Sequence, residues 1–332
     1  MTTSMNTPTP SMPSKPSMPS MPSNSAITST PERAFFHPTN ALWWLYCLAV
    51  GLGTIYLVAA VVPALSSTQL AVGTVLPLIA VTAVIFGLVI LVLDPFGARS
   101  GWLLLAGAVA GGTIATAVSL KGNEYIYATV PQILGAQAGS AWESALAGPM
   151  TEEWSKGLCI LLIMLIAGAA VARPIHGLLI GAFVGLGFQI VENIIYAANG
   201  AFDNANSDLS GAWSTTILRS IIGVSSHWVW SAIAGVGVAI ILGRIWGRFR
   251  TGLLTAVGLI VLGWFLHFFW NMPIGSGPVG MLVKAVLTLT ALAFVVRWVW
   301  KQERDFLTEV PSSVDATRLP NPTPAMGDHE AR

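Results

Sequence analysis

Two adjacent carboxylates and a lysine stand near the start of one of the chain's apolar runs. Glu152 and Glu153 are followed by Lys156, and a run rich in Leu, Ile, Met and Ala then continues to Val171. An ionised side chain at the centre of a membrane-spanning helix costs about 2.5–3.5 kcal/mol. Lys156 lies three and four residues after the carboxylates, so both can reach its ammonium group. The two carboxylates leave an excess of negative charge, which suits proton transfer or cation binding.

Further polar residues interrupt the later apolar runs, namely Glu192, His227, His267 and Asn271. Imidazole nitrogens and carboxylate oxygens are ligands that zinc takes at catalytic sites, where one position stays open for water. We therefore predict that Glu192, His227 and His267 bind a divalent metal ion, with Zn²⁺ as the first candidate. Asn271 lies four residues after His267 on the same helix face, where its amide can stabilise an oxyanion.

The acidic pair also has a catalytic interpretation. Glu152 or Glu153 can act as a general base on water, and Lys156 can set the pKa values of the two carboxyl groups. Simpler explanations exist for each residue. A lone histidine in a membrane is often an interhelical hydrogen bonder, and the Glu152–Lys156 pair can sit at the membrane interface. Arg219 and Lys284 lie near the ends of their runs and are expected to anchor at lipid headgroups. The catalytic interpretation rests on the predicted location of the acids and histidines at one depth.

Composition predicts the elements that must hold these residues. Of 332 residues, 54% are hydrophobic and only 9% are charged, whereas soluble domains carry about 25% charge. The fold class is therefore all-α, a polytopic membrane helical bundle of about eight transmembrane helices. A net charge of +1 indicates no nucleic-acid partner. The predicted spans cover roughly residues 41–65, 69–93, 101–120, 150–172, 174–198, 214–243, 251–272 and 279–300.

The domain organisation follows from these runs. Residues 1–38 form a Met/Pro/Ser-rich tail that is predicted to be disordered, residues 39–304 form the membrane-embedded domain, and residues 305–332 form a second disordered tail. Arginines are concentrated in alternate loops, so the positive-inside rule places both termini in the cytoplasm. We therefore expect a multi-pass protein of the cell membrane whose acids and histidines lie in the outer half of the bilayer.

Two other classes of function compete with catalysis. A proton-coupled transporter can use a Glu/His relay, but it would string polar groups from one face to the other and often shows inverted repeats. The sequence indicates one polar layer and no internal repeat. A scaffold without catalysis would have no need for the complete polar set. The sequence makes no prediction of the oligomeric state.

Taken together, the motifs resemble those of the PrsW family of intramembrane proteases, within the wider CAAX-protease and Abi superfamily. The family pattern is EExxK, FxxxEN, a separate histidine, and HxxxD or HxxxN. The resemblance covers roughly residues 40–300, and the matching residues are Glu152, Glu153, Lys156, Phe188, Glu192, Asn193, His227, His267 and Asn271.

The resemblance implies a membrane-embedded endopeptidase, usually called a metalloprotease, that cuts a membrane-anchored protein near the outer leaflet. In the best-known members the substrate is an anti-sigma factor. The implied partners are that substrate and the lipid bilayer. Asn271 stands where some members have Asp, and related CAAX-type enzymes place a histidine at the position of Glu192. Those relatives are thought to use a glutamate-activated water without metal, so the resemblance leaves the metal requirement open.

Overall fold

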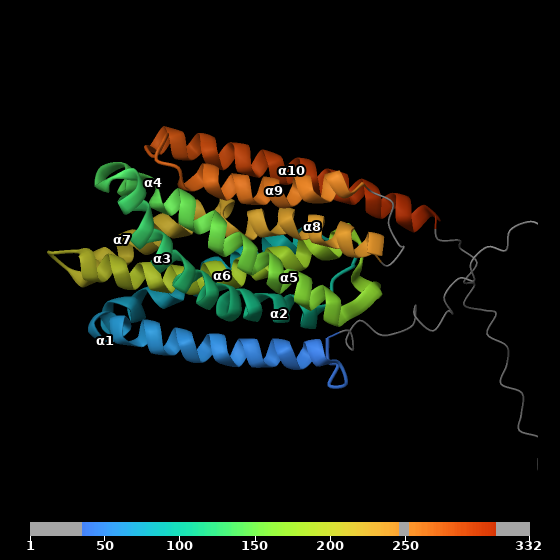
Figure 1. Cartoon of the computed structure of the whole chain (residues 1–332), viewed down its shortest axis with the longest axis horizontal. Coiled ribbons are helices and arrows are strands. Elements are labelled where there is room, and N and C mark those ends of the chain that lie inside the picture. Colours follow the sequence, from blue (N-terminus) through green and yellow to red (C-terminus); the bar gives the residue numbers. More distant parts are fainter. Residues whose placement is uncertain (1–34, 246–251, 310–332) are drawn as a thin grey trace, which may run out of the picture.

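The computed structural model describes residues 35–245 and 252–309. Over these ranges the secondary structure is helical and contains no strand. The helices run roughly along one long axis and form a single bundle, as Figure 1 shows. The prediction of an all-α membrane bundle is confirmed.

Within the described residues, seven helical segments are long and apolar enough to cross a membrane, which makes the chain a multi-pass membrane protein. The predicted fourth span, roughly residues 150–172, is not among these segments. Its apolar part forms α5, Trp154–Ala167, of 14 residues, which directly follows a π-helical turn over Pro149–Glu153. Gly168 ends this helix with a positive φ of 71°. The seven segments are Ala41–Pro63, Leu65–Val92, Gly101–Leu134, Pro174–Asp203, Asp208–Ile245, Leu253–Asn271 and Pro278–Thr308.

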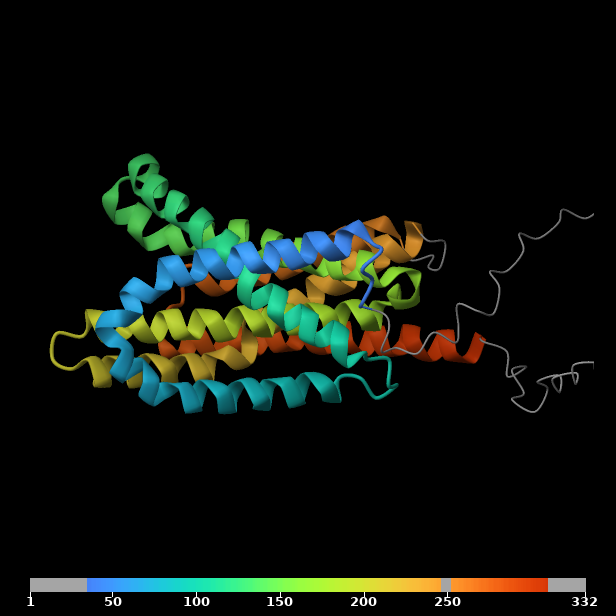
Figure 2. The ribbon, with the colours of Figure 1, turned by 90° about the horizontal axis from the view of Figure 1, so that it is seen from below.

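The first two spans belong to one continuous helix, α1 (Ala41–Val92). Pro63 lies inside it and divides the two spans, since a proline in a helix interior kinks the helix. The two halves run in opposite directions in Figure 2. Next come α2 (Gly101–Ala110), a π-helical turn η3 (Gly111–Ala115), α3 (Thr116–Leu134) and α4 (Ala136–Gly148).

Helix α6 (Pro174–Asp203) lies in the middle of the bundle and packs closely on α8 (His227–Ile245). Glycines make this approach possible, because a Cβ on Gly181 or Gly185 would collide with the backbone carbonyl of Ser231 or His227. Small residues four apart are typical of helix packing in membranes. The crossing brings the start of α8 against the second half of α6.

The predicted span 214–243 is broken in the structure. It consists of α7 (Asp208–Ile222), a short 3₁₀ turn η6 (Gly223–Ser225) and α8, with non-helical Ser226 before His227. Irregular backbone at membrane depth is tolerated where protein buries it or where it lines a cavity. His227 is consequently the first residue of a helix rather than a residue in the middle of one.

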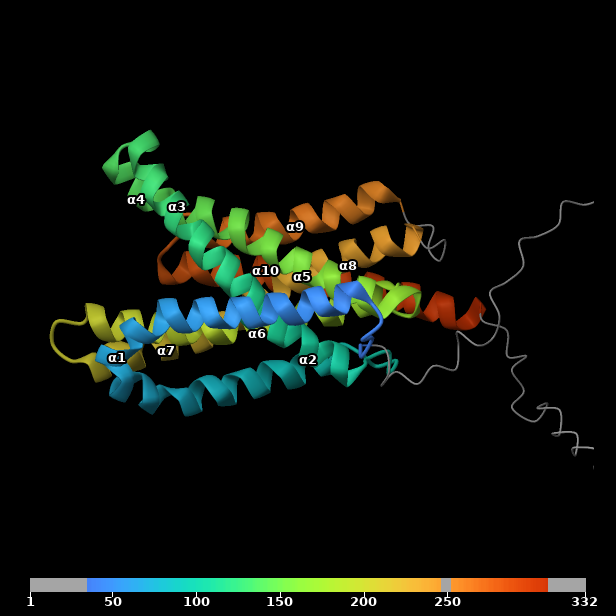
Figure 3. The same cartoon turned by 60° about the horizontal axis from the view of Figure 1, so that its bottom comes forward.

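The last two helices complete the bundle. Helices α9 (Leu253–Asn271) and α10 (Pro278–Glu309) are neighbours in Figure 3. Most of the predicted tails, residues 1–38 and 305–332, lies outside the described residues. The helix α10 continues past the predicted boundary at residue 304, because Arg173 forms an ion pair with buried Glu303 and Lys301 pairs with Asp305.

Candidate active site

The two adjacent carboxylates lie on a π-helical turn, η4, which spans Pro149–Glu153. Pro149 begins this turn directly after α4, where its missing N–H interrupts the backbone hydrogen bonds of the α-helix. Glu152 and Glu153 are both buried, with 5% and 8% of their surface exposed. Single π turns inside α-helices are frequent at functional sites. This turn directs two consecutive side chains into the bundle.

Lys156 is fully buried and neutralises part of this charge. Its Nζ donates to Glu153 Oε1 over 2.5 Å and lies 3.9 Å from Glu152 Oε2. The pairing that the sequence predicts is therefore present. Because Lys156 also lies 3.0 Å from His227 Nδ1, its ammonium group connects the acidic pair to the first histidine.

Each histidine uses one ring nitrogen to contact a carboxylate. His227 Nε2 lies 2.7 Å from Glu192 Oε2, and His267 Nδ1 lies 2.8 Å from Glu153 Oε1. A carboxylate accepts, so these ring nitrogens carry the protons. The opposite nitrogens then carry lone pairs, which is the arrangement of a metal-binding histidine held by an outer carboxylate.

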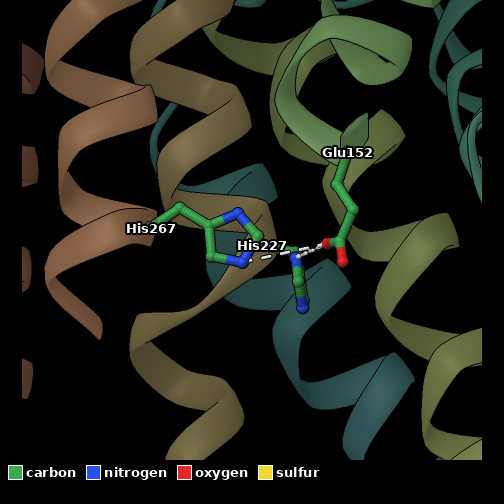
Figure 4. Close-up of side chains that lie close together, drawn as sticks. All are labelled: Glu152, His227 and His267. Atoms are coloured by element: carbon green, nitrogen blue, oxygen red, sulfur yellow. Dashed lines mark ion pairs between the residues drawn. The ribbon is translucent and has the colours of Figure 1, made fainter. Parts of the chain in front are cut away.

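The two lone-pair nitrogens face Glu152 (Figure 4). His227 Nδ1 lies 3.6 Å and His267 Nε2 lies 3.8 Å from Glu152 Oε2. Ligand atoms of these three residues all lie within 4.8 Å of one another. Ligands about 2 Å from a tetrahedral ion are about 3.3 Å apart, close to the observed spacing. Glu152, His227 and His267 could therefore hold a metal ion.

Two observations test whether an ion fits at this place. Glu152 Oε2 is buried and has no hydrogen-bond partner among the described residues, although buried acceptors are normally satisfied. Gly148 lies next to His267, and a Cβ there would come within 2.9 Å of His267 Nε2. The free acceptor and the space kept by glycine both fit a cation. In the structure His227 Nδ1 accepts from Lys156 Nζ and His267 Nε2 accepts from Asn271 Nδ2, and an ion bound at these nitrogens would replace both hydrogen bonds.

Glu192, which the sequence predicts as a metal ligand, contacts His227. It lies behind His227 and forms an ion pair with Arg219, while Glu152 is the carboxylate that faces both imidazoles. Arg219 Nε also donates to Asn193 Oδ1 over 2.6 Å. Arg219 thus lines the site, which corrects the expectation that it anchors at headgroups. Glu192 is in contact with the site but is outside the group that could hold the ion.

Asn271 reaches the site as predicted from its spacing. Its Nδ2 lies 3.1 Å from His267 Nε2 and donates to the Ser144 carbonyl over 3.1 Å. Lys284, a second expected headgroup anchor, is instead buried and donates to the carbonyls of Trp270 and Met272. A cation at the last carbonyls of a helix stabilises that helix end. Lys284 therefore fixes the end of α9 that carries the site.

Asn123 is a site residue that the sequence reasoning missed. From α3, it donates to Glu152 Oε1 over 3.1 Å and accepts from the Thr151 hydroxyl. This leaves Oε2 of the same carboxylate facing the histidines. A single asparagine in a segment with Lys121 and Glu124 gives no signal of this role, since it has the composition of an exposed loop.

Aromatic side chains enclose the histidines. Trp230 stacks on His267 with ring centroids 4.2 Å apart, and Phe188 lies 4.9 Å from His227. A cavity opens beside these rings and is lined also by Tyr127, Glu192 and Arg219 among others. The apolar wall limits water on one side, while the polar lining faces the space where a substrate can enter.

Comparison with known families agrees with this geometry. The model of a family described as PrsW family intramembrane metalloprotease matches residues 99–300, more than half of the chain. The match includes all of the site residues described above. No curated protein and no solved structure matches the chain significantly.

Proposed function

The chain belongs to the PrsW family of intramembrane metalloproteases, and on that basis we propose that Glu152, His227 and His267 hold the metal ion of a membrane-embedded peptidase. The free buried oxygen of Glu152, between two lone-pair nitrogens, is the observation that carries this proposal. The nitrogen and oxygen donors suit zinc. The proposed ligands share both histidines with the sequence prediction, but Glu152 replaces Glu192 as the carboxylate ligand.

The residues around the proposed metal ligands then have separate roles. When bound, zinc would supply Lewis-acid chemistry, which makes water easier to deprotonate for attack on a carbonyl. Glu153 Oε1 orients His267, while Glu153 Oε2 has no partner among the described residues and is available to accept the proton from water. Lys156 holds Glu153 through the ion pair, and Glu192 orients His227.

Asn271 is proposed to stabilise the oxyanion. Its amide nitrogen lies beside His267 Nε2 and lines the same cavity. A preorganised amide donor at a developing negative charge is worth about 2.7–4 kcal/mol in other hydrolases. Replacement of Asn271 by Leu should therefore lower kcat about 100-fold or more.

A metal-free mechanism is the second candidate, and one contact favours it. Lys156 Nζ lies 3.0 Å from His227 Nδ1, at the side where an ion would bind. In this alternative Glu152 activates the water and the lysine occupies the place of the cation. The two mechanisms differ in their response to a chelator.

The substrate is proposed to be a membrane-anchored protein, an anti-sigma factor in regulated signalling being the first candidate. We place both termini in the cytoplasm and the site near the outer leaflet, on the charge bias of the loops. This orientation agrees with Figure 1, where α1 begins and α10 ends at the same end of the bundle, with the gapless run of α4, η4 and α5 as an eighth crossing beside the seven apolar segments. Family membership argues against the alternative of a proton-coupled transporter.

The decisive experiment combines metal analysis with cleavage. Purified protein should contain about one zinc per chain and should cleave a single-span peptide in a chelator-sensitive way. His227→Ala should lose both properties. His176→Gln is the matched control, because His176 is buried beside Arg173, outside the site. Full cleavage by metal-free protein would reject the metal site and favour Glu152 as the base.

A further inference from the structure

We propose that a groove between α3 and α6 binds the substrate segment next to the scissile bond in an extended conformation. This inference rests on the proposed peptidase function and adds where the substrate lies. The groove has a volume of about 310 Å³, within the range of about 300–1,000 Å³ that ligand pockets have. Figure 3 shows α3 passing across α6 in this region.

The groove adjoins the cavity beside the histidines. Four residues line both spaces, namely Tyr127, Glu152, Glu192 and Tyr196. Glu152 therefore has open space on two sides. A peptide that runs through both spaces would pass the metal-binding group with one part on each side of its cleaved bond.

The wall supplied by α3 is unusually polar for a membrane span. Thr116, Ser119, Asn123 and Tyr127 follow at spacings of three and four, so they share one helix face. Lipid hydrocarbon cannot hydrogen-bond with such a row of polar side chains. An unwound substrate segment, whose backbone has no internal hydrogen bonds, does need hydrogen-bond partners at membrane depth. The hydroxyl protons of Thr116 and Ser119 are donated to carbonyls of their own helix. Thr116 and Ser119 have only 3% and 2% of their surface exposed, so they form the inner wall of the groove.

Part of the remaining lining is apolar and suits side chains of a membrane segment, while Glu124 and Asn199 add polar groups. Leu120, Phe188 and Ile195 line the groove. Extended backbone places alternate side chains on opposite sides. One set can face these apolar residues while the backbone N–H groups meet the polar face of α3. The ligand class is therefore an unwound, apolar segment of a single-span protein.

The test uses the full chain and one probe, a synthetic single-span peptide with an Asn-Gly-Gly sequence in its outer half, where the helix unwinds easily. A photoreactive benzoylphenylalanine replaces Ile195 in the groove, or Ile221 as the control. Ile221 lies on α7 with 66% of its surface exposed, outside the groove lining. In parallel, Ile195→Trp and Ile221→Trp are compared in cleavage and in zinc binding.

We expect light-dependent capture of the peptide at position 195 and not at 221. Ile195→Trp should raise KM about tenfold with unchanged zinc content, because a filled groove weakens substrate binding without touching the ion. Cleavage without capture at 195 and with unchanged KM would overturn the groove and leave the peptidase standing. Capture at 195 without cleavage by any zinc-loaded protein would keep the groove and reject the proposed function. Absence of both capture and cleavage would reject both.

Discussion

Substitution of Glu153 by Gln separates two jobs that one carboxylate performs. Glu153 pairs with fully buried Lys156 at 2.5 Å and accepts from His267 Nδ1 at 2.8 Å. Removal of one partner of a buried ion pair costs about 3–5 kcal/mol, because the other charge stays buried. Glu152 lies 3.9 Å from the same ammonium and compensates in part, so we expect a loss of about 3 kcal/mol.

The same substitution should weaken metal binding by a second route. An outer carboxylate that orients a ligating histidine is worth about 10–100-fold in metal affinity, or about 1.4–2.7 kcal/mol. Zinc affinity measured by competition with a fluorescent chelator should fall by that factor in Glu153→Gln. Thermal unfolding reports the loss of stability separately.

A double-mutant cycle with Lys156→Met distinguishes the two routes. In the Met background the destabilising effect of Glu153→Gln should vanish or reverse sign, since Glu153 is then itself a buried carboxylate without its ammonium partner. The effect on zinc should persist, because His267 still lacks its carboxylate. If the zinc effect disappeared in that background, Glu153 would act through the lysine and our account of His267 would be refuted. Asp305→Asn, in an exposed pair with Lys301, is the control and should change neither quantity.

Three further substitutions test the surroundings of the site. Gly148→Ala should lower zinc affinity at least about tenfold, because the new Cβ would lie 2.9 Å from His267 Nε2 and 2.8 Å from Asn271 Nδ2, which must shift. Gly157→Ala, with no described atom within 4 Å of its Cβ, should bind zinc normally. Arg219→Gln leaves Glu192 without its ion pair and should reduce kcat/KM about tenfold, with partial rescue by Arg219→Lys; unchanged kinetics would show that the pair is only structural. Lys284→Met should lower stability by about 1–2 kcal/mol in thermal unfolding, and an unchanged midpoint would contradict the capping role.

The sequence predicts the helical bundle because long apolar runs have few other stable forms in a bilayer. It also predicts which ionisable residues gather, since each would be costly if it stood alone in lipid. It does not predict which carboxylate faces the imidazoles. Glu152 and Glu192 lie on two different helical segments, and both contact His227. Which of the two carboxylates faces both imidazoles depends on how each segment is rotated about its axis. A π turn and a helix break decide that rotation here, and neither has a clear sequence signal.

Arg219 and Lys284 show a second limit of the sequence. A basic residue near the end of an apolar run has the same pattern whether its long side chain reaches the headgroups or folds back into the protein. In the structure the guanidinium pairs with Glu192 and the ammonium caps the end of α9. The partner decides between the two, and it belongs to a different helix in each case. Only the tertiary arrangement could reveal these contacts.

The irregular helix segments explain why the site can form inside a membrane at all. In a regular helix, consecutive residues point about 100° apart, so Glu152 and Glu153 could not easily serve one site. The π turn η4 carries both, the break before α8 exposes His227 at a helix start, and α9 ends just after His267. Each irregularity leaves backbone groups that must lie in protein or beside a cavity. The site lies where three such segments meet, so the same irregular backbone that needs protein or a cavity around it also positions the site's acids and histidines.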